Sequence, residues 1–313
     1  MASRENAADV KIEELRVFLS KEKAKYVFSP KFIFLCGKGI DKKDHDYKVT
    51  NRGIIDRYIR NKASFAYIVL SEKIWEADYS KTIDLLTFEE FLAEISDCII
   101  IFIESIGSSC ELGAFTLQEN QFQNKLILVL DQQYQNEESF INKGPVAKAI
   151  SLKIPVIYAD LGGPLLSSNS LIKEVDAALV RMQQKTPENL RSITPIEKNG
   201  ISLRTFIIEI IELIQLLQPV TSEELISVYK RLKNLVSFSL VKQDGTKFTR
   251  KIEIRYLLQL LVVVGIVKSD GSFFSSNELL DSTNILFNFS FESRSRNRAR
   301  SRILARRFHY KMR

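Results

Sequence analysis

Short apolar runs alternate with longer stretches of helical periodicity over the first 183 residues. The runs are rich in β-branched and aromatic residues, whereas the stretches between them place apolar residues three or four positions apart. Strands are expected at 31–36, 65–70, 98–103, 125–130 and 154–158, and helices at 8–26, within 40–63, and at 87–95, 109–122 and 171–182. This alternation predicts an α/β domain, a parallel sheet flanked by helices, over 1–183.

The pattern changes most sharply after the third expected strand. Cys98 to Ile103 is apolar at every position, as in a parallel strand covered on both faces. Glu104 ends the run, and small residues follow, so the chain is expected to turn at the carboxyl end of the strand. Open α/β sheets bind their ligands there. Gly107 in this turn would let a ligand approach the main chain closely.

Glu111 has two interpretations. Ser108 and Glu111 have the spacing of a capping box, so Glu111 could simply cap a helix. In the first turn it would also lie at the positive end of the helix, which favours the ionised carboxylate. Such a carboxylate can attack an anomeric carbon or stabilise an oxocarbenium-like transition state. Glu104 also has more than one interpretation. It could hold ribose hydroxyls or act as the acid that partners Glu111, or it could simply be the solvated end of the strand.

A glycine pair, Gly37 and Gly39, follows the first expected strand. Two glycines after a strand could cradle a phosphate or a ribose. The third glycine of a dinucleotide-binding fingerprint is missing, however, and a tight turn explains the pair equally.

Composition limits the remaining chemistry. The chain has 313 residues, 45% hydrophobic and 27% charged, as in a globular protein of two domains. It lacks an apolar run of about 20 residues and an apolar signal core, so we expect a cytoplasmic protein without a membrane segment. Cys36, Cys98 and Cys110 lie in or beside apolar segments, which favours buried, reduced thiols.

Two histidines, His45 and His309, lie in a polar loop and in a basic tail. Neither position suits a Ser-His-Asp or Cys-His arrangement or a histidine metal site, and no Walker loop is present. Carboxylates are therefore the candidate catalytic groups, and no metal is expected.

A different pattern begins beyond residue 183. Residues 184–202 read as a linker, and an apolar helix is expected at 203–217. Thr221 and Glu224 have the spacing of a capping box that opens another helix. Expected hairpins at 237–249 and 266–274 flank a helix at 251–264. Helices followed by hairpins predict a winged-helix-like domain over 203–292, with a small module for protein contacts as the alternative.

Positive charge is concentrated in residues 293–313. This tail holds eight Arg and one Lys with no acidic residue, which gives it a charge of +9. Because the net charge of the whole chain is +7, residues 1–292 have a net charge of 7 − 9 = −2. It is either a solvated end or a polyanion-binding segment. The nucleic-acid contacts expected from the second domain and the tail are Arg250, Lys251, Arg255, Lys268, Arg294, Arg296, Arg298 and Arg300.

Three segments together resemble a known family: FIFLCGKG, IIIFIESIGSSCELGAF, and SFINKGPV at Ser139–Val146. They are similar, in order and spacing, to the effector proteins encoded beside retron reverse transcriptases. The N-terminal domain of those effectors resembles nucleoside 2-deoxyribosyltransferases, which are Rossmann-like. The resemblance implies that Glu111 is the nucleophile and that Gly107 matches a family glycine. Ser105 stands where the transferases carry an aspartate that protonates the leaving base.

Serine is a poor general acid at neutral pH, so a leaving group that needs no protonation fits better. Nicotinamide on a ribose already carries a positive charge. The resulting hypothesis is an N-glycosidase that cleaves NAD or a related nucleotide, with no further cofactor. Its substrate-binding residues are expected to be Gly37, Gly39, Glu104, Ser105, Gly107, Ser108 and Asn142, the last closing the pocket.

The resemblance also implies partners. As a toxic effector against phage-infected cells, the protein would be restrained by the retron reverse transcriptase and its multicopy single-stranded DNA–RNA hybrid. A homo-oligomer or higher assembly is expected. Two alternatives stay open: base exchange between deoxynucleosides, and a nucleotide-sensing, nucleic-acid-binding module without catalysis.

Overall fold

The computed structural model describes residues 30–38, 47–77, 83–117, 122–184, 200–242, 244–248 and 253–277. The chain divides into two compact units: Pro30–Lys185, and a second unit whose described part begins at residue 200. Several sequence predictions lie outside the described residues: the helix at 8–26, Gly39, His45, Arg250, Lys251, and the tail with Arg294, Arg296, Arg298, Arg300 and His309. None of the described helices has the length and hydropathy needed to cross a bilayer.

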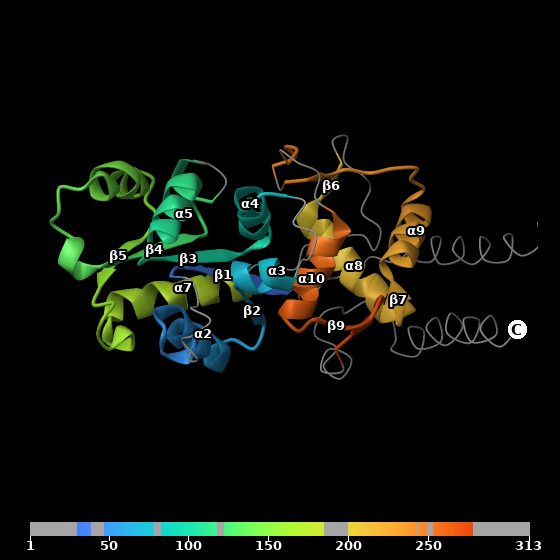
Figure 1. The fold of residues 1–313 in the computed structure, drawn as a ribbon, viewed down its shortest axis with the longest axis horizontal. Helices are drawn as coiled ribbons and strands as arrows, with labels where there is room; N and C mark the ends of the chain where they lie inside the picture. Colours follow the sequence, from blue (N-terminus) through green and yellow to red (C-terminus); the bar gives the residue numbers. More distant parts are fainter. Residues whose placement is uncertain are drawn as a thin grey trace, which may run out of the picture. The chain divides into compact units, whose positions relative to one another are not determined.

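The first unit is built on a five-stranded parallel sheet in the order β2-β1-β3-β4-β5 (Figure 1). The α/β prediction is therefore confirmed. The strands are β1 (Lys31–Cys36), β2 (Ala66–Val69), β3 (Cys98–Ile103), β4 (Leu126–Asp131) and β5 (Val156–Ala159). The α-helices are α2 (Asn51–Lys62), α3 (Ser71–Ala77), α4 (Leu85–Ile95), α5 (Ile106–Leu117), α6 (Ala147–Ser151) and α7 (Asn169–Gln184). Short helical segments are η1 (Tyr47–Val49), η2 (Gln132–Tyr134), η3 (Asn142–Val146) and η4 (Leu165–Ser167).

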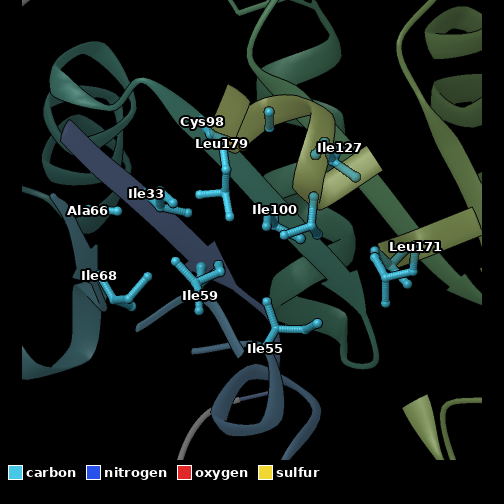
Figure 2. Packing of buried hydrophobic residues seen from close by; sticks show 14 of the residues in the cluster. Ile33, Ile55, Ile59, Ala66, Ile68, Cys98, Ile100, Ile127, Leu171 and Leu179 are labelled. Carbon is cyan, nitrogen blue, oxygen red and sulfur yellow. The ribbon is translucent and has the colours of Figure 1, made fainter. Parts of the chain in front are cut away.

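Helices cover both faces of this sheet (Figure 1). On one face, α2 and α7 pack onto alternate strand residues, and Figure 2 shows Ile55 and Leu179 meeting Ile33 and Ile100 in one apolar cluster. On the other face lie α4 and α5, where the rings of Phe34 and Phe115 are 6.4 Å apart. Burial on both faces explains why the strands are apolar throughout rather than alternating.

The strand order reverses between β1 and β3. β1 is paired with β2 on one side and with β3 on the other, with Cys36 opposite Ile101. Because the chain leaves these two strands in opposite directions, their carboxyl ends form the switch point at which such sheets bind ligands. Gly37 follows β1 and Glu104 follows β3, so both expected site segments lie at this switch point.

Helix starts were the weakest sequence predictions. α5 begins at Ile106, three residues before the expected start. α4 begins at Leu85, two residues before the expected start, and is capped by Asp84, whose side chain accepts from the main-chain nitrogen of Thr87. The thiols also differ from expectation: Cys36 and Cys98 are buried, but Cys110 is exposed. The early start of α5 turns Cys110 toward solvent.

The second unit holds β6 (Ile201–Ser202), α8 (Leu203–Leu217), β7 (Val220–Thr221), α9 (Ser222–Lys233), β8 (Leu240–Val241), α10 (Ile254–Val263), β9 (Val267–Asp270) and β10 (Phe273–Ser276). Strands β7, β10 and β9 form an antiparallel sheet, which confirms the second expected hairpin. The Thr221–Glu224 capping box is also confirmed. Of the first expected hairpin, the described residues show a bridge between Val241 and Lys247, and β8 pairs in parallel with β6.

Candidate active site

Two serines fix the turn between β3 and α5. The hydroxyl oxygen of Ser108 accepts from the main-chain nitrogens of Glu104 and Ser105, each at 3.0 Å. The Ser105 hydroxyl in turn accepts from the nitrogen of Ser108 at 3.2 Å, so Ser105 caps α5. Both hydroxyls thus hold the turn. Their contact with a sugar or phosphate stays a prediction.

Glu111 is not a helix cap. It is the sixth residue of α5, in the second turn, and the predicted Ser108–Glu111 capping box is wrong because Ser105 already occupies the cap. The Glu111 side chain is instead hydrogen-bonded to the side chain of Glu89 on α4. Its Oε2 atom is buried and has no hydrogen-bond partner among the described residues.

The surroundings of Glu111 favour its protonated form. Burial contributes most, followed by the negative charge and hydrogen bond of Glu89; with the charge of Glu72, they outweigh Arg52 and raise the pKa of Glu111 to about 9. Burial also raises the pKa of Glu89. Two carboxyl groups can hydrogen-bond to each other only when one is protonated, so this carboxyl pair shares a proton. The expectation that the helix end keeps Glu111 ionised is wrong, because the effect fades beyond the first turn.

The start of α2 joins three parts of the same sheet edge. The Asn51 amide donates to the carboxylate of Glu104 and, at 3.0 Å, to the carbonyl of Leu161 after β5. Glu104 is therefore tied to α2, and Glu89 rather than Glu104 is the carboxyl hydrogen-bonded to Glu111. A role for Glu104 in holding ribose remains a prediction.

The glycines of the two turns differ. A Cβ atom at Gly37 would lie 3.2 Å from the Cβ of Phe102 and 3.3 Å from the Cδ of Arg52, so packing alone favours glycine there. A Cβ at Gly107 would meet nothing nearer than the Ser105 hydroxyl at 3.8 Å. Gly107 is exposed, so its main chain is open to a ligand.

Asn142 is used inside its own loop. Its amide donates to the carbonyls of Tyr134 at 2.7 Å and Glu137 at 2.8 Å, which fixes the segment between β4 and η3. The segment η3 packs beside α5. A pocket-closing role for Asn142 stays a prediction. Its two hydrogen bonds already explain why an asparagine stabilises this loop.

Sequence reasoning missed Glu89, Arg52 and Glu72. Glu89 left one signal, since it lies among Phe88, Phe91 and Leu92 on the buried side of a helix, where a carboxyl is costly. Arg52 left another, because a cation in the first turn opposes the helix dipole. Glu72 left none, since an acidic residue in a first turn is ordinary.

The described nucleic-acid candidates of the second unit are Arg255 and Lys268. Arg255 is the second residue of α10, forms an ion pair with Glu253 at 3.1 Å and lies over the ring of Tyr256. Lys268 is exposed on β9. Elsewhere α10 is apolar apart from Gln259.

The first unit is thus an α/β fold with a doubly covered parallel sheet, and the carboxyl groups of Glu89 and Glu111 lie on two helices that cover one face of this sheet. Residues 48–269 match the family model of the STM3845 retron effector protein. The match covers most of the chain, which therefore belongs to this retron effector family.

Two relatives from Escherichia coli match shorter parts of the chain. One, "Retron Ec73 putative ribosyltransferase/DNA-binding protein", is 36% identical over 138 residues, which cover 43% of this chain and 42% of that protein. The other, "Retron Ec86 putative ribosyltransferase/DNA-binding protein", is 52% identical over 62 residues, 20% of each chain. The matched part thus spans less than half the length of either relative.

Proposed function

We propose that the first unit breaks the N-glycosidic bond of NAD or a related nucleotide, with Glu111 as nucleophile or as stabiliser of the oxocarbenium-like transition state. The observation that carries this proposal is the buried, hydrogen-bonded carboxyl pair of Glu89 and Glu111 at the carboxyl edge of the sheet. A carboxylate beside an anomeric carbon can attack it or stabilise the oxocarbenium-like transition state of glycosidic cleavage. The names of the two relatives, which include ribosyltransferase, point to the same class of bond.

The pair suits a cleavage in which the proton moves between its members. When the shared proton lies on Glu89, Glu111 is ionised and faces the anomeric carbon. The C1′–N bond breaks, its electron pair neutralises the pyridinium nitrogen, and nicotinamide leaves without protonation. Water then supplies hydroxide to C1′ and gives its proton to the ionised Glu111, and the pair releases one proton to solvent, which restores the starting state.

The charges around the pair favour a cationic ring. Three carboxyl groups, Glu72, Glu89 and Glu111, act on one another there, and the guanidinium of Arg52 opposes them. A positively charged nicotinamide ring would lower the cost of ionising Glu111 as it binds.

Base exchange between deoxynucleosides is the second candidate, and Glu89 favours it. Ser105 cannot protonate a neutral leaving base, but a protonated Glu89 beside Glu111 could. The missing aspartate therefore no longer separates the two substrates. Supplying a deoxynucleoside with a second free base distinguishes exchange from hydrolysis.

We also propose that the second unit is a winged-helix-like module that binds the retron DNA–RNA hybrid, and that the hybrid and the reverse transcriptase restrain the toxic activity during antiphage defence in the cytoplasm. The order α8, β7, α9, α10, β9, β10 with an antiparallel β7-β10-β9 sheet supports this fold. The relatives are named DNA-binding. A salt-dependent affinity for a labelled hybrid, weakened in Lys268→Glu, would support it. The apolar character of α10 favours the alternative, a module for protein contacts or assembly of several copies.

Release of nicotinamide from NAD, followed by chromatography, tests the catalytic proposal. We expect turnover by the wild-type chain and none by Glu111→Gln. NAD binding without products in the wild type, with the partners absent, would instead support a sensing module.

A further inference from the structure

The side chain of Asn51 is fixed by two hydrogen bonds at the carboxyl edge of the sheet. The nitrogen of its amide donates to one carboxylate oxygen of Glu104 and to the carbonyl oxygen of Leu161, the latter at 3.0 Å. Both partners are acceptors, so the nitrogen must face them and both of its N–H groups are used. The contacts therefore determine the orientation of the amide.

The same contacts leave two acceptors without donors. The amide oxygen of Asn51 and the second carboxylate oxygen of Glu104 have no hydrogen-bond partner among the residues that the structure describes. Both side chains are half-buried, so they are partly open to solvent. Because the hydrogen bond keeps the two groups in contact, they offer a ligand two neighbouring acceptors and one negative charge.

Two neighbouring acceptors select a ligand with two neighbouring donors. The vicinal 2′- and 3′-hydroxyls of a ribose are such donors, and acidic side chains bind ribose hydroxyls in sheets of this kind. An ionised phosphate brings acceptors and a negative charge, which the carboxylate of Glu104 would repel. A 2-deoxyribose lacks the 2′-hydroxyl, so it would leave one acceptor without a donor.

Glu104 is also tied to the helix that carries Glu111. Its main-chain nitrogen donates to the hydroxyl of Ser108 at 3.0 Å. Ser108 precedes Glu111 by three residues in α5, which is about 4.5 Å along the helix. A ribose held by its 2′- and 3′-hydroxyls has C1′ directly beside the bound C2′, so the sugar contact and the proposed nucleophile belong to one turn of the chain.

We propose that Glu104 and Asn51 form the ribose subsite of the first unit, and that their paired acceptors select ribose over 2-deoxyribose by binding both vicinal hydroxyls. This inference rests on the proposed function and deepens it by naming the sugar. It favours NAD-type ribonucleotides over deoxynucleosides, two substrates that Glu89 does not distinguish.

The test compares NAD with its analogue that carries 2-deoxyribose on the nicotinamide side, as the ratio of their kcat/KM values. The two glycosidic bonds differ in intrinsic lability, but this difference is the same for every variant of the full chain. A change in the ratio therefore reports recognition of the 2′-hydroxyl.

Glu104→Gln is the sharpest variant, because it keeps an oxygen for the Asn51 amide but replaces the second acceptor by a donor and removes the charge. We expect the preference for ribose to fall by about tenfold or more, as for a lost hydrogen bond to a charged group. Asn51→Ala removes the other acceptor, so the preference should fall there too, with a higher KM for NAD.

Asp176→Asn is the matched control. Asp176 on α7 accepts from the hydroxyl of Tyr58 at 2.8 Å, so it also ties α2 to another element, without contacting a candidate site residue. Its ratio should equal that of the wild type. An unchanged ratio in Glu104→Gln or in Asn51→Ala, or an equal change in Asp176→Asn, overturns the subsite.

Calorimetry with both dinucleotides separates this inference from the proposed function. It is carried out on Glu111→Gln, with and without Glu104→Gln. If the wild type cleaves neither dinucleotide but NAD binds more tightly than its analogue and loses that advantage with Glu104→Gln, the proposed reaction is wrong and the subsite stands. If NAD is cleaved but both dinucleotides bind equally, the subsite is wrong and the cleavage stands. Binding of neither dinucleotide overturns the subsite.

Discussion

Glu111 in the first unit and Glu209 in the second are both carboxyl groups largely removed from water, and their surroundings differ in kind. Glu209 pairs with the ammonium of Lys233 at 2.6 Å and accepts from the hydroxyl of Tyr229 at 2.6 Å, with both charged side chains at most 5% exposed. Glu111 has another carboxyl as its partner and one oxygen with none among the described residues.

The difference distinguishes a buried carboxyl group that stabilises the fold from one that is suited to a functional site. A buried carboxylate that meets an ammonium and a hydroxyl is compensated where it lies. The pKa of a buried carboxyl rises when its partner is another carboxyl. Residues with strongly shifted pKa values are common at functional sites. The following predictions test that contrast, starting with the largest effect.

Replacing Glu209 by alanine should destabilise the second unit by about 3–5 kcal/mol, because Lys233 would keep a buried charge without its carboxylate. The free energy of unfolding from urea titration measures this. Tyr229→Phe is the matched control and should cost about 1.5–3 kcal/mol, since it removes one hydrogen bond to a charged group. A loss below 1 kcal/mol in Glu209→Ala would mean that the pair is not a structural ion pair.

Replacing Glu89 by glutamine should raise the rate of NAD cleavage at acidic pH, because the neutral amide removes the negative charge that opposes ionisation of Glu111. The single-turnover rate of nicotinamide release is the measurement. Glu90→Gln, the adjacent carboxyl on α4, is the control. Equal rates in Glu89→Gln and Glu90→Gln would show that Glu89 does not act on Glu111 during the reaction.

The stability of the wild type relative to Glu111→Gln should fall as pH rises from 4.5 to about 9. Within this window the folded chain holds a proton on Glu111 that the unfolded chain has released. The contribution of this proton to the free energy of unfolding is therefore fully present below pH 4.5 and is lost as the pH rises to about 9. The slope cannot exceed about 1.4 kcal/mol per pH unit, because one proton is involved. Urea titrations at several pH values measure it, and a stability difference that rises with pH would refute the raised pKa.

Replacing Thr221 by alanine should cost about 1 kcal/mol of unfolding free energy, because Thr221 and Glu224 form the reciprocal cap of α9. Glu111→Gln should show no comparable loss, since Glu111 caps nothing. Thermal unfolding of the two variants measures this difference. A loss of about 1 kcal/mol in Glu111→Gln would mean that Glu111 caps a helix after all.

The sequence was sufficient for the sheet but not for the arrangement of charge. The five strands of the first unit follow from short, mostly apolar runs, because helices cover both faces of the sheet. The place of the site at the ends of β1 and β3 follows from alternation and the switch point. The Thr221 cap was predictable because its hydroxyl and Glu224 have no competitor.

The Ser108–Glu111 cap failed where several serines compete. Ser105, Ser108 and Ser109 are all able to cap a helix, and the choice depends on where β3 ends in three dimensions. The carboxyl pair was also beyond reach, because Glu89 and Glu111 lie on different helices that only the sheet brings together. Periodicity reports which side of a helix is buried, not what it meets there.

The most direct test of the central claim compares nicotinamide release from NAD by the wild type, Glu111→Gln and Glu209→Gln under conditions where all three are folded. The account predicts loss of cleavage in Glu111→Gln and wild-type cleavage in Glu209→Gln. Cleavage by Glu111→Gln at the wild-type rate would contradict it.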